Sequence, residues 1–256
     1  MRIYEEEPRA IKDYISKHRD VTLEDEEPTF RNYMARIQKF KTVDASTKML
    51  EIGIGTGWFP ILCKAKGLSC KGLEISPHLL EYARAQGARC GAEPDLELAN
   101  IEDYDLGKEQ YDVIIASSVF EHVEHWEKGL QKVYDALRPD GVLFFESTNK
   151  FTLKSAEYNF PLYGWLPDFL RYRLRIAAQG PDIMHLGIDF NQFRYRQLRR
   201  FFRKLGFRRI ADRVEVADLS SKTGWKRSLL EAGQKSAVLK TLMLTFMQVT
   251  TFVCVK

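Results

Sequence analysis

From Lys48 onwards, short apolar runs alternate with longer amphipathic stretches. The apolar runs are KMLEI, CKGLE, LELA, YDVIIAS and VLFFES, and helices are predicted near 58–66, 77–86 and 126–137. Strands that alternate with helices at this spacing predict a parallel sheet covered on both faces. Because crossovers between parallel strands are right-handed, the pattern indicates a doubly wound α/β fold. VTTFVCVK at the end of the chain is predicted to be a closing strand.

The length and composition of the chain fit one large domain. Its 256 residues are 45% hydrophobic and 29% charged, which is enough to bury a full core. We expect a helical N-terminal extension over 1–45 and one domain over 46–256, with a lid inserted over 150–193. No run approaches the roughly 18 apolar residues of a membrane span. The opening MRIYEEEPRA also lacks the order of a secretory signal, so we expect a cytoplasmic protein.

Charge is divided unevenly along the chain. Residues 1–149 hold 19 Lys or Arg against 27 Asp or Glu, a net of −8, whereas residues 150–227 hold 17 against 7, a net of +10. The later segment is therefore expected either to meet an anionic partner or to form a solvated basic face. The four cysteines include no Cys-x-x-Cys pair and indicate neither a zinc knuckle nor a redox dithiol.

A glycine-rich bend follows the first predicted strand, in the sequence MLEIGIGTGW. Gly53, Gly55 and Gly57 lack a Cβ, so the backbone can adopt positive φ and approach a ligand closely. The dinucleotide fingerprint Gly-x-Gly-x-x-Gly is not met, because Trp58 or Pro60 stands at the position of its third glycine. No Gly-Lys-Ser/Thr of a Walker motif follows either. An acidic residue followed by three alternating glycines remains to be explained.

This pattern resembles motif I of class I S-adenosylmethionine-dependent methyltransferases. The resemblance implies a seven-stranded, mostly parallel Rossmann-like sheet, S-adenosylmethionine as the cofactor, and cofactor contacts from the three glycines. In that family the bend holds a sulfonium and an amino acid, and Glu51 has the right charge to attract the ammonium group. Glu74 ends the second predicted strand, where a carboxylate can accept hydrogen bonds from ribose hydroxyls. Ser76 and Pro77 then predict the start of a helix.

Further segments follow in the family's order. Ala99-Asn100-Ile101-Glu102-Asp103 resembles the segment beside the adenine, although Asn100 stands where the family usually has Asp. Asn offers both a donor and an acceptor to the adenine edge, and Ile101 an apolar face to the ring. The strand YDVIIAS and the segment LRPDG continue the resemblance. It therefore also places Ile75 and Ser117 at the cofactor.

Histidines are the candidates for the catalytic base. Methyl transfer from a sulfonium is an in-line displacement, so the enzyme must align the acceptor and, for a hydroxyl, remove its proton. Imidazole groups titrate near neutral pH, which suits that task. His122 follows the carboxyl end of the fourth predicted strand, where open α/β sheets bind ligands. His125, His185 and Asp189 are further candidates for the same role.

The string Phe120-Glu121-His122-Val123 resembles the Leu-Glu-His-Val of ubiquinone-biosynthesis O-methyltransferases and their relatives. The resemblance implies that Glu121 and His122 act in catalysis; a structural pair beneath the cofactor is the alternative. Some members of that group hold a divalent metal with acidic residues and this histidine. Here Ser118 stands where a further glutamate is expected, and two ligands are too few for a dependable site, so no metal is predicted.

Residues 160–176 mix Trp, Phe, Leu and Tyr with Arg171, Arg173 and Arg175, as an interfacial helix does. We expect this segment to contact anionic membranes peripherally, with the arginines contributing, which would suit a hydrophobic substrate. Aromatic residues at such spacing are also common in protein cores, and a core role for them stays open.

The expected function is methyl transfer from S-adenosylmethionine to a small molecule, at an oxygen nucleophile. The basic residues over 194–209 keep an RNA methyltransferase as an alternative. A nucleic-acid partner is disfavoured because the exit of the fourth strand reads Ala-Ser-Ser-Val, without the Asn-Pro-Pro-Tyr segment of base-amino methylators. The sequence is also compatible with a protein methyltransferase and with a non-catalytic regulator that binds only the cofactor.

Overall fold

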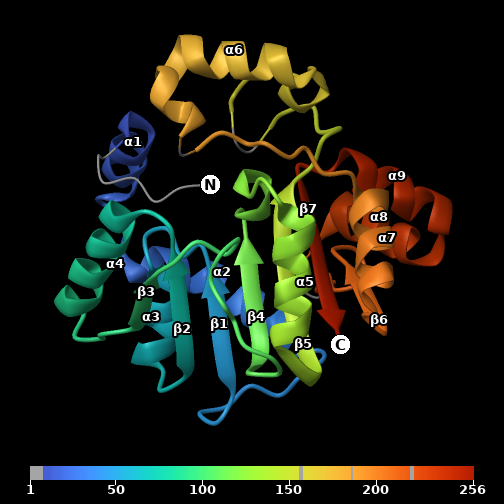
Figure 1. The fold of residues 1–256 in the computed structure, drawn as a ribbon. Helices are drawn as coiled ribbons and strands as arrows, with labels where there is room; N and C mark the ends of the chain where they lie inside the picture. Colours follow the sequence, from blue (N-terminus) through green and yellow to red (C-terminus); the bar gives the residue numbers. More distant parts are fainter. Residues whose placement is uncertain (1–7, 156–157, 186, 220–221) are drawn as a thin grey trace.

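The computed structural model describes residues 8–155, 158–185, 187–219 and 222–256, which form one seven-stranded sheet with helices on both faces (Figure 1). The strands are β1 (Lys48–Ile52), β2 (Ser69–Glu74), β3 (Asp95–Leu98), β4 (Tyr111–Ser117), β5 (Leu137–Thr148), β6 (Arg209–Asp212) and β7 (Val249–Val255). The helices are α1 (Arg9–His18), α2 (Leu23–Ile37), α3 (Trp58–Ala65), α4 (Pro77–Arg89), α5 (Trp126–Ala136), α6 (Asp168–Gln179), α7 (Tyr195–Leu205), α8 (Gly224–Lys235) and α9 (Ala237–Phe246). Three short 3₁₀ turns within these ranges are η1 (Phe120–His122), η2 (Tyr163–Trp165) and η3 (Pro181–Met184).

The strands follow the order β3-β2-β1-β4-β5-β7-β6. Neighbours from β3 to β5 pair in parallel, and β7 runs antiparallel to both β5 and β6. The chain lays β1, β2 and β3 in one direction and then returns to place β4 on the other side of β1. Ligands bind at such a reversal in open α/β sheets, because the loops after the two strands diverge there. The predicted seven-stranded, mostly parallel, doubly wound fold is confirmed.

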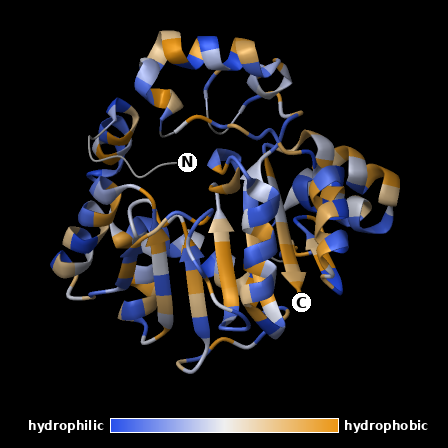
Figure 2. Ribbon diagram, viewed as in Figure 1, coloured by the Kyte–Doolittle hydropathy of each residue, from blue (hydrophilic) through white to orange (hydrophobic). Residues whose placement is uncertain are grey.

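Alternate residues of the strands face opposite layers of helices, since successive side chains of a strand point to the two faces in turn. Val142 and Phe144 of β5 pack in the cluster that includes α2 and α3. Leu143 and Phe145 pack in the cluster that includes α5 and α7. Figure 2 shows the hydrophobic residues concentrated in the central strands between these layers. The sheet is therefore buried on both faces.

Helix α2 belongs to this core. It begins at a capping box, in which the Thr22 hydroxyl accepts from the Asp25 N–H and the Asp25 carboxylate accepts from the Thr22 N–H. Phe30, Tyr33 and Ile37 follow at helical spacing and are buried against the sheet. The domain boundary at residue 45 stays a prediction, but α2 packs as part of the sheet's cover.

The segment 150–193 contains η2, α6 and η3, and α6 lies with α1 above the carboxyl ends of the parallel strands (Figure 1). A buried charge cluster holds it together. Asp189 bonds to Arg171 at 2.8 Å and to Arg175 at 3.1 Å, and its carboxylate accepts from the Tyr163 hydroxyl. Arg171 and Arg175 are buried, so they cannot contribute to vesicle binding as the sequence suggested; Arg173 is exposed.

Helices α8 and α9 follow β6 and pack on each other before the chain enters β7. Ser236 separates them, and its hydroxyl accepts from the Leu239 N–H at the start of α9. Leu244 is buried in the main core, whereas Trp225, Val238 and Leu242 are exposed. None of the described helices combines the length and the apolar composition needed to cross a membrane.

Candidate active site

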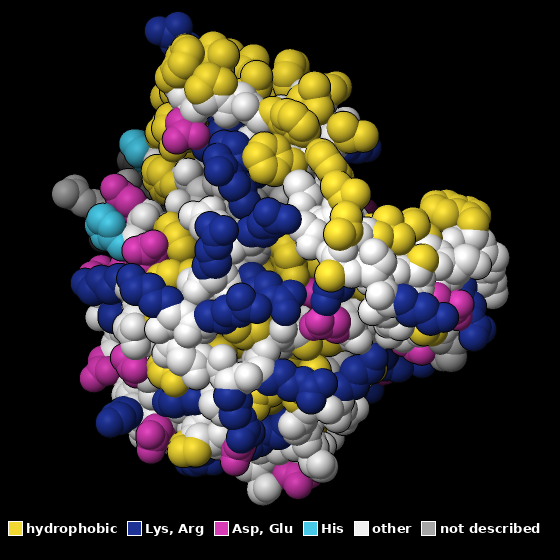
Figure 3. Space-filling model, turned by 90° about the vertical axis from the view of Figure 1, so that its right-hand side faces the viewer, with side chains coloured by type: hydrophobic (Ala, Val, Ile, Leu, Met, Phe, Trp, Pro, Cys, Tyr) yellow, Lys and Arg dark blue, Asp and Glu magenta, His cyan; other side chains and the backbone are white. Residues whose placement is uncertain are grey.

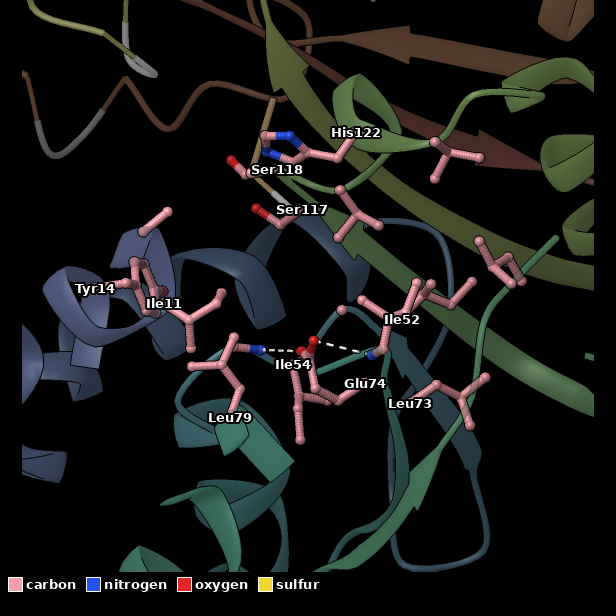
Figure 4. A pocket seen from close by; sticks show the side chains of 18 of the residues that line it. Ile11, Tyr14, Ile52, Ile54, Leu73, Glu74, Leu79, Ser117, Ser118 and His122 are labelled. Atoms are coloured by element: carbon pink, nitrogen blue, oxygen red, sulfur yellow. Dashed lines mark hydrogen bonds between the residues drawn. The ribbon is translucent and has the colours of Figure 1, made fainter. Parts of the chain in front are cut away.

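A cavity of about 480 Å³ lies where the carboxyl ends of β1, β2 and β4 meet (Figure 4). Helix α1 and the α6–η3 segment contribute its remaining walls. Most of the predicted cofactor residues line it, together with the catalytic candidate His122: Glu51, Gly53, Gly55, Glu74, Ile75, Asn100, Ile101 and Ser117. The fold therefore brings residues from four strand ends to one cavity.

The glycine bend is shaped by close contacts as well as by its dihedral angles. Gly53, Gly55 and Gly57 have φ values of 69°, 55° and 78°, which disfavour residues with a Cβ. A Cβ on Gly53 would lie 2.4 Å from Val119, and one on Gly57 would lie 2.6 Å from the Ala83 side chain. Gly57 is absent from the cavity lining, so its position serves the contact between the bend and α4.

Glu74 anchors the bend from the neighbouring strand. Its Oε2 accepts from the Gly55 N–H at 2.9 Å, and its Oε1 accepts from the N–H groups of Ile75 at 2.9 Å and Ser76 at 3.0 Å. Burial raises the pKa of the Glu74 carboxyl, and the three backbone donors oppose that shift. Each carboxylate oxygen has about two acceptor sites, so Oε2 can accept a further hydrogen bond from a ligand. The predicted helix start at Ser76 and Pro77 is confirmed.

Glu51 supplies a buried carboxylate to the same cavity. It is only 4% exposed, and its Oε2 has no hydrogen-bond partner among the described residues. Burial raises the pKa of this carboxyl well above its ordinary value, and Cys70 and Glu74 add to the shift. An orphaned buried acceptor is costly unless a ligand donates to it. Glu51 therefore fits the ammonium group of an amino-acid ligand.

The end of β3 presents the adenine candidates. Asn100 and Ile101 both line the cavity. The Asn100 amide bonds within its own loop, accepting from the Glu102 N–H at 3.0 Å and donating to Asp103 at 3.3 Å. These bonds fix the amide plane, and Ile101 offers an apolar surface beside it.

Ser117 is positioned by a side chain of helix α2. The Tyr33 hydroxyl of α2 lies 2.8 Å from Ser117 Oγ, and both residues line the cavity. Burial raises the Tyr33 pKa, with a further contribution from Glu146, so the phenol stays protonated. The next residue, Ser118, has a φ of 55°, an uncommon conformation for a residue other than glycine. Strained backbone of this kind gathers at functional sites.

His122 is oriented by a contact with the segment 150–193. Its Nδ1 lies 2.9 Å from the carbonyl oxygen of Ile188, and its ring points toward Ser118 in Figure 4. A carbonyl oxygen only accepts, so Nδ1 carries the hydrogen of this bond. In the neutral ring, the lone pair then resides on Nε2.

The remaining catalytic candidates lie outside the cavity lining. Glu121 is fully buried, and its Oε2 accepts from the Ser147 hydroxyl at 2.8 Å. His125 and His185 are exposed, and Asp189 is enclosed by its arginine partners. The structure thus brings His122, and not these residues, to the cavity lined by the predicted cofactor residues. No cluster of three or more His, Cys, Asp or Glu side chains placed to hold a metal occurs in the described parts of the chain.

Two walls of the cavity were not predicted from the sequence. Ile11 and Tyr14 of α1 line it, and a Cβ on Gly55 would lie 3.1 Å from the Tyr14 hydroxyl. Arg175 and Gln179 of α6 line it from the other side. The sequence indicated that both segments are helical, but no motif marks which strand end they cover.

The fold and the cavity define the class of S-adenosylmethionine-dependent methyltransferases, whose cofactor fits the acidic and apolar groups just described. Residues 25–212 match the family described as the methyltransferase domain, and the chain belongs to that family.

Individual relatives agree with this assignment. The chain is 32% identical over 113 residues to a ubiquinone biosynthesis O-methyltransferase of Actinobacillus pleuropneumoniae, covering 42% of this chain and 48% of that protein. It is 29% identical over 136 residues to a malonyl-[acyl-carrier protein] O-methyltransferase of Calditerrivibrio nitroreducens, covering 51% and 52%. The chain thus spans about half the length of these curated relatives. A solved S-adenosylmethionine-dependent methyltransferase from Archaeoglobus fulgidus shares the fold, with a TM-score of 0.58 and 16% identity over 95% of this chain and 98% of that one.

Proposed function

We propose that this chain transfers the methyl group of S-adenosylmethionine to an oxygen atom of a small-molecule acceptor, with His122 as the general base. The placement of His122 carries the proposal. Its ring lines the cavity at the exit of β4, and the bond from Nδ1 to Ile188 leaves the lone pair on Nε2. A positioned imidazole with that tautomer can take the proton of an acceptor hydroxyl as the oxygen attacks.

The cofactor-binding roles follow from the cavity walls. Glu51 would meet the ammonium group and Glu74 the ribose hydroxyls, while Asn100 and Ile101 would flank the adenine. When bound, S-adenosylmethionine supplies an electrophilic methyl group. The protein residues hold the cofactor, exclude water and orient the acceptor. Alignment of the two reactants lowers the barrier of an in-line displacement.

Two observations support a small acceptor and an oxygen nucleophile. Tyr14 of α1 and Gln179 of α6 line the cavity together with the strand ends, and its volume of about 480 Å³, which the cofactor would share with the acceptor, favours a small acceptor. Both relatives named above are O-methyltransferases by their names.

A labelling experiment tests the proposal. The purified chain is incubated with methyl-labelled S-adenosylmethionine and a fractionated cell extract, and the label is followed into small molecules, protein and RNA. We expect label in small molecules, attached through a methyl ether or ester. Label on RNA or protein would establish a macromolecular acceptor instead. Tight cofactor binding without any labelled product would favour a non-catalytic regulator.

We also propose that the lid contacts an anionic membrane surface from which the acceptor is delivered. Large apolar side chains of the lid are exposed, including Leu153 at 68% and Phe169 at 59%. Figure 3 shows hydrophobic side chains gathered over this end of the molecule, with Lys and Arg below them. Lys154, Arg173 and Arg194 are the exposed basic residues of the same stretch of chain. Apolar side chains combined with basic ones bind anionic interfaces.

Vesicle flotation tests this contact. We expect the chain to float with vesicles that contain phosphatidylglycerol and Phe169→Glu to abolish flotation. Trp225→Glu makes the same charge change on a 72% exposed aromatic residue of α8 and should leave flotation intact. Absence of flotation for the parent chain, or equal loss in both variants, would remove the membrane proposal without affecting the methyl-transfer proposal.

A further inference from the structure

A second concave site lies at the edge of the sheet, beside β6. It has a volume of about 520 Å³ and is lined by side chains of α7, of β6 and its flanking residues, and by Phe40 in the turn after α2. Four of the residues that line it are arginines: Arg199, Arg203, Arg208 and Arg209. We refer to this site as the arginine groove. Its four arginines belong to the basic segment 194–209, which the methyl-transfer proposal does not use.

The arginine groove carries an excess of positive charge. Arg199 bonds to the buried Asp212 at 3.2 Å, and Arg208 bonds to Asp140. Within the described ranges, Arg203 and Arg209 form no ion pair; the Arg209 guanidinium lies over the Phe40 ring at 4.9 Å.

The acidic side chain that lines the groove does not cancel this excess. Glu215 bonds to Lys240 at 2.5 Å and accepts from the Asp212 N–H. Its charge is therefore already matched by a lysine. The guanidinium groups of Arg203 and Arg209 are left to face the groove without a compensating carboxylate.

The arginine groove is separate from the cofactor cavity in position and in charge. Arg209 of β6 is paired with Val255 of β7, Val255 with Val142 of β5, and Val142 with Val113 of β4. Arg209 therefore lies level with Val113, near the start of β4. The cofactor cavity lies at Ser117, four residues further along β4, or about 13 Å at the rise of a strand. The cavity contains the carboxylates of Glu51 and Glu74, which suit a cation, whereas the arginine groove suits an anion.

We propose that the arginine groove binds a small ligand that carries a phosphate or diphosphate group, held mainly by Arg203 and Arg209. Like charges around a concavity focus a positive potential and raise the local concentration of anions. The planar guanidinium fork matches phosphate oxygens in a bidentate manner, which a solvated lysine does not. The enclosed volume is enough for a phosphorylated metabolite or the headgroup of a phospholipid.

Binding of inorganic pyrophosphate and of ATP, measured by calorimetry at physiological ionic strength, tests the proposal. The groove variant is Arg203→Gln/Arg209→Gln. The matched control is Arg196→Gln/Arg200→Gln, which removes the same charge from exposed positions of α7 outside the groove. We expect the Kd for pyrophosphate to rise at least about tenfold in the groove variant and less than about twofold in the control. Unchanged S-adenosylmethionine affinity in both variants would show that the fold is intact.

Several results would overturn the proposal. One is the absence of measurable heat with either probe. Another is an equal rise of the Kd in the two variants, which would indicate non-specific attraction. Preferential binding of single-stranded RNA with an affinity that rises with its length would assign the surface to nucleic acid. Flotation with phosphatidic acid vesicles that the groove variant abolishes and the control retains would support the phosphate site and assign its source to a lipid headgroup. Competition by free pyrophosphate without flotation would support a soluble ligand.

Discussion

The Glu74 carboxylate accepts a hydrogen bond from the Gly55 N–H at 2.9 Å. This bond joins the bend after β1 to the end of β2, and it links the two segments that we propose to hold the cofactor. Because Glu74 also accepts from Ile75 and Ser76, one side chain sets the shape of both loops.

Glu74→Gln is expected to weaken S-adenosylmethionine binding strongly. An amide has one acceptor oxygen where the carboxylate has two, so either the bend or the ribose loses its partner. Loss of charge-assisted hydrogen bonds costs about 1.5 to 3 kcal/mol, so the Kd should rise about ten- to 150-fold. Calorimetry measures this, with Glu81→Gln on the exposed face of α4 as the control. An unchanged Kd in Glu74→Gln would count directly against the assigned role.

Cofactor affinity is expected to depend on pH through Glu51. Its pKa is raised in the folded protein by burial, and a bound ammonium group would favour the ionised form and lower that pKa. Affinity should therefore increase as the pH rises through the Glu51 pKa, with release of a proton on binding. Calorimetry in two buffers of different ionisation enthalpy detects the proton. Glu51→Gln should weaken binding and abolish the release; a variant that still releases the proton would exclude Glu51 as its source.

Glu51 also affects stability in a defined direction. Because its folded-state pKa is raised, its contribution to the free energy of unfolding is fully present below the unfolded pKa of about 4.3 and is lost as the pH rises through the folded value. In the absence of cofactor, Glu51→Gln should therefore flatten the pH dependence of urea unfolding above that range. Parallel profiles for the two proteins would contradict this expectation.

His122→Asn is expected to abolish most methyl transfer while leaving cofactor binding intact. The asparagine amide can still donate to the Ile188 carbonyl, but it cannot take a proton from the acceptor. Loss of a general base lowers kcat by about a hundred- to ten-thousandfold. Product labelling measures the loss, and His125→Asn, an exposed residue outside the cavity, is the control. A pH–rate profile without an ascending limb in the parent chain would argue against a histidine base.

Asp189→Asn is expected to destabilise the lid. It leaves the buried Arg175 without a carboxylate and Arg171 with only that of the exposed Asp168, and breaking a buried pair in this way costs about 3 to 5 kcal/mol. Hydrogen exchange should show loss of protection in η2, α6 and η3 before the sheet is affected. Asp182→Asn, on an exposed position of η3, should change neither protection nor stability. Uniform loss of protection across the whole chain would show that the lid is not an independent unit.

Gly57→Ala is expected to lower the free energy of unfolding by more than the strain of a positive φ alone. Gly91 also has positive φ, but a Cβ there meets no atom within 4 Å, so Gly91→Ala should cost about 1 kcal/mol of unfolding free energy. At Gly57 the same strain is joined by a 2.6 Å contact with Ala83, which adds about 1 to 3 kcal/mol. Urea unfolding compares the two variants. Equal costs would mean that α4 shifts to accommodate the methyl group.

Much of the cofactor cavity was predictable because its determinants are local. Glu51 and the glycines follow one strand directly, and Glu74 ends the next, so each can be recognised at its strand end. Parallel strands bring their carboxyl ends to one edge of the sheet, which converts sequence order into proximity. Glu121 shows the limit of this reasoning. It is adjacent to His122, yet its carboxylate turns into the core to meet Ser147.

The alternation of strands and helices, the glycine bend and the acids that belong to it can all be read along the chain, because propensity, capping and close backbone approach act within a few residues. Three features appear only in the folded chain. Tyr14 lies over Gly55, and Asp189 forms buried ion pairs with Arg171 and Arg175. The third is the groove lined by four arginines. Burial and charge pairing depend on which distant segments pack together. Contacts between distant segments produce no periodic pattern in the sequence, so they cannot be recognised before the chain is folded.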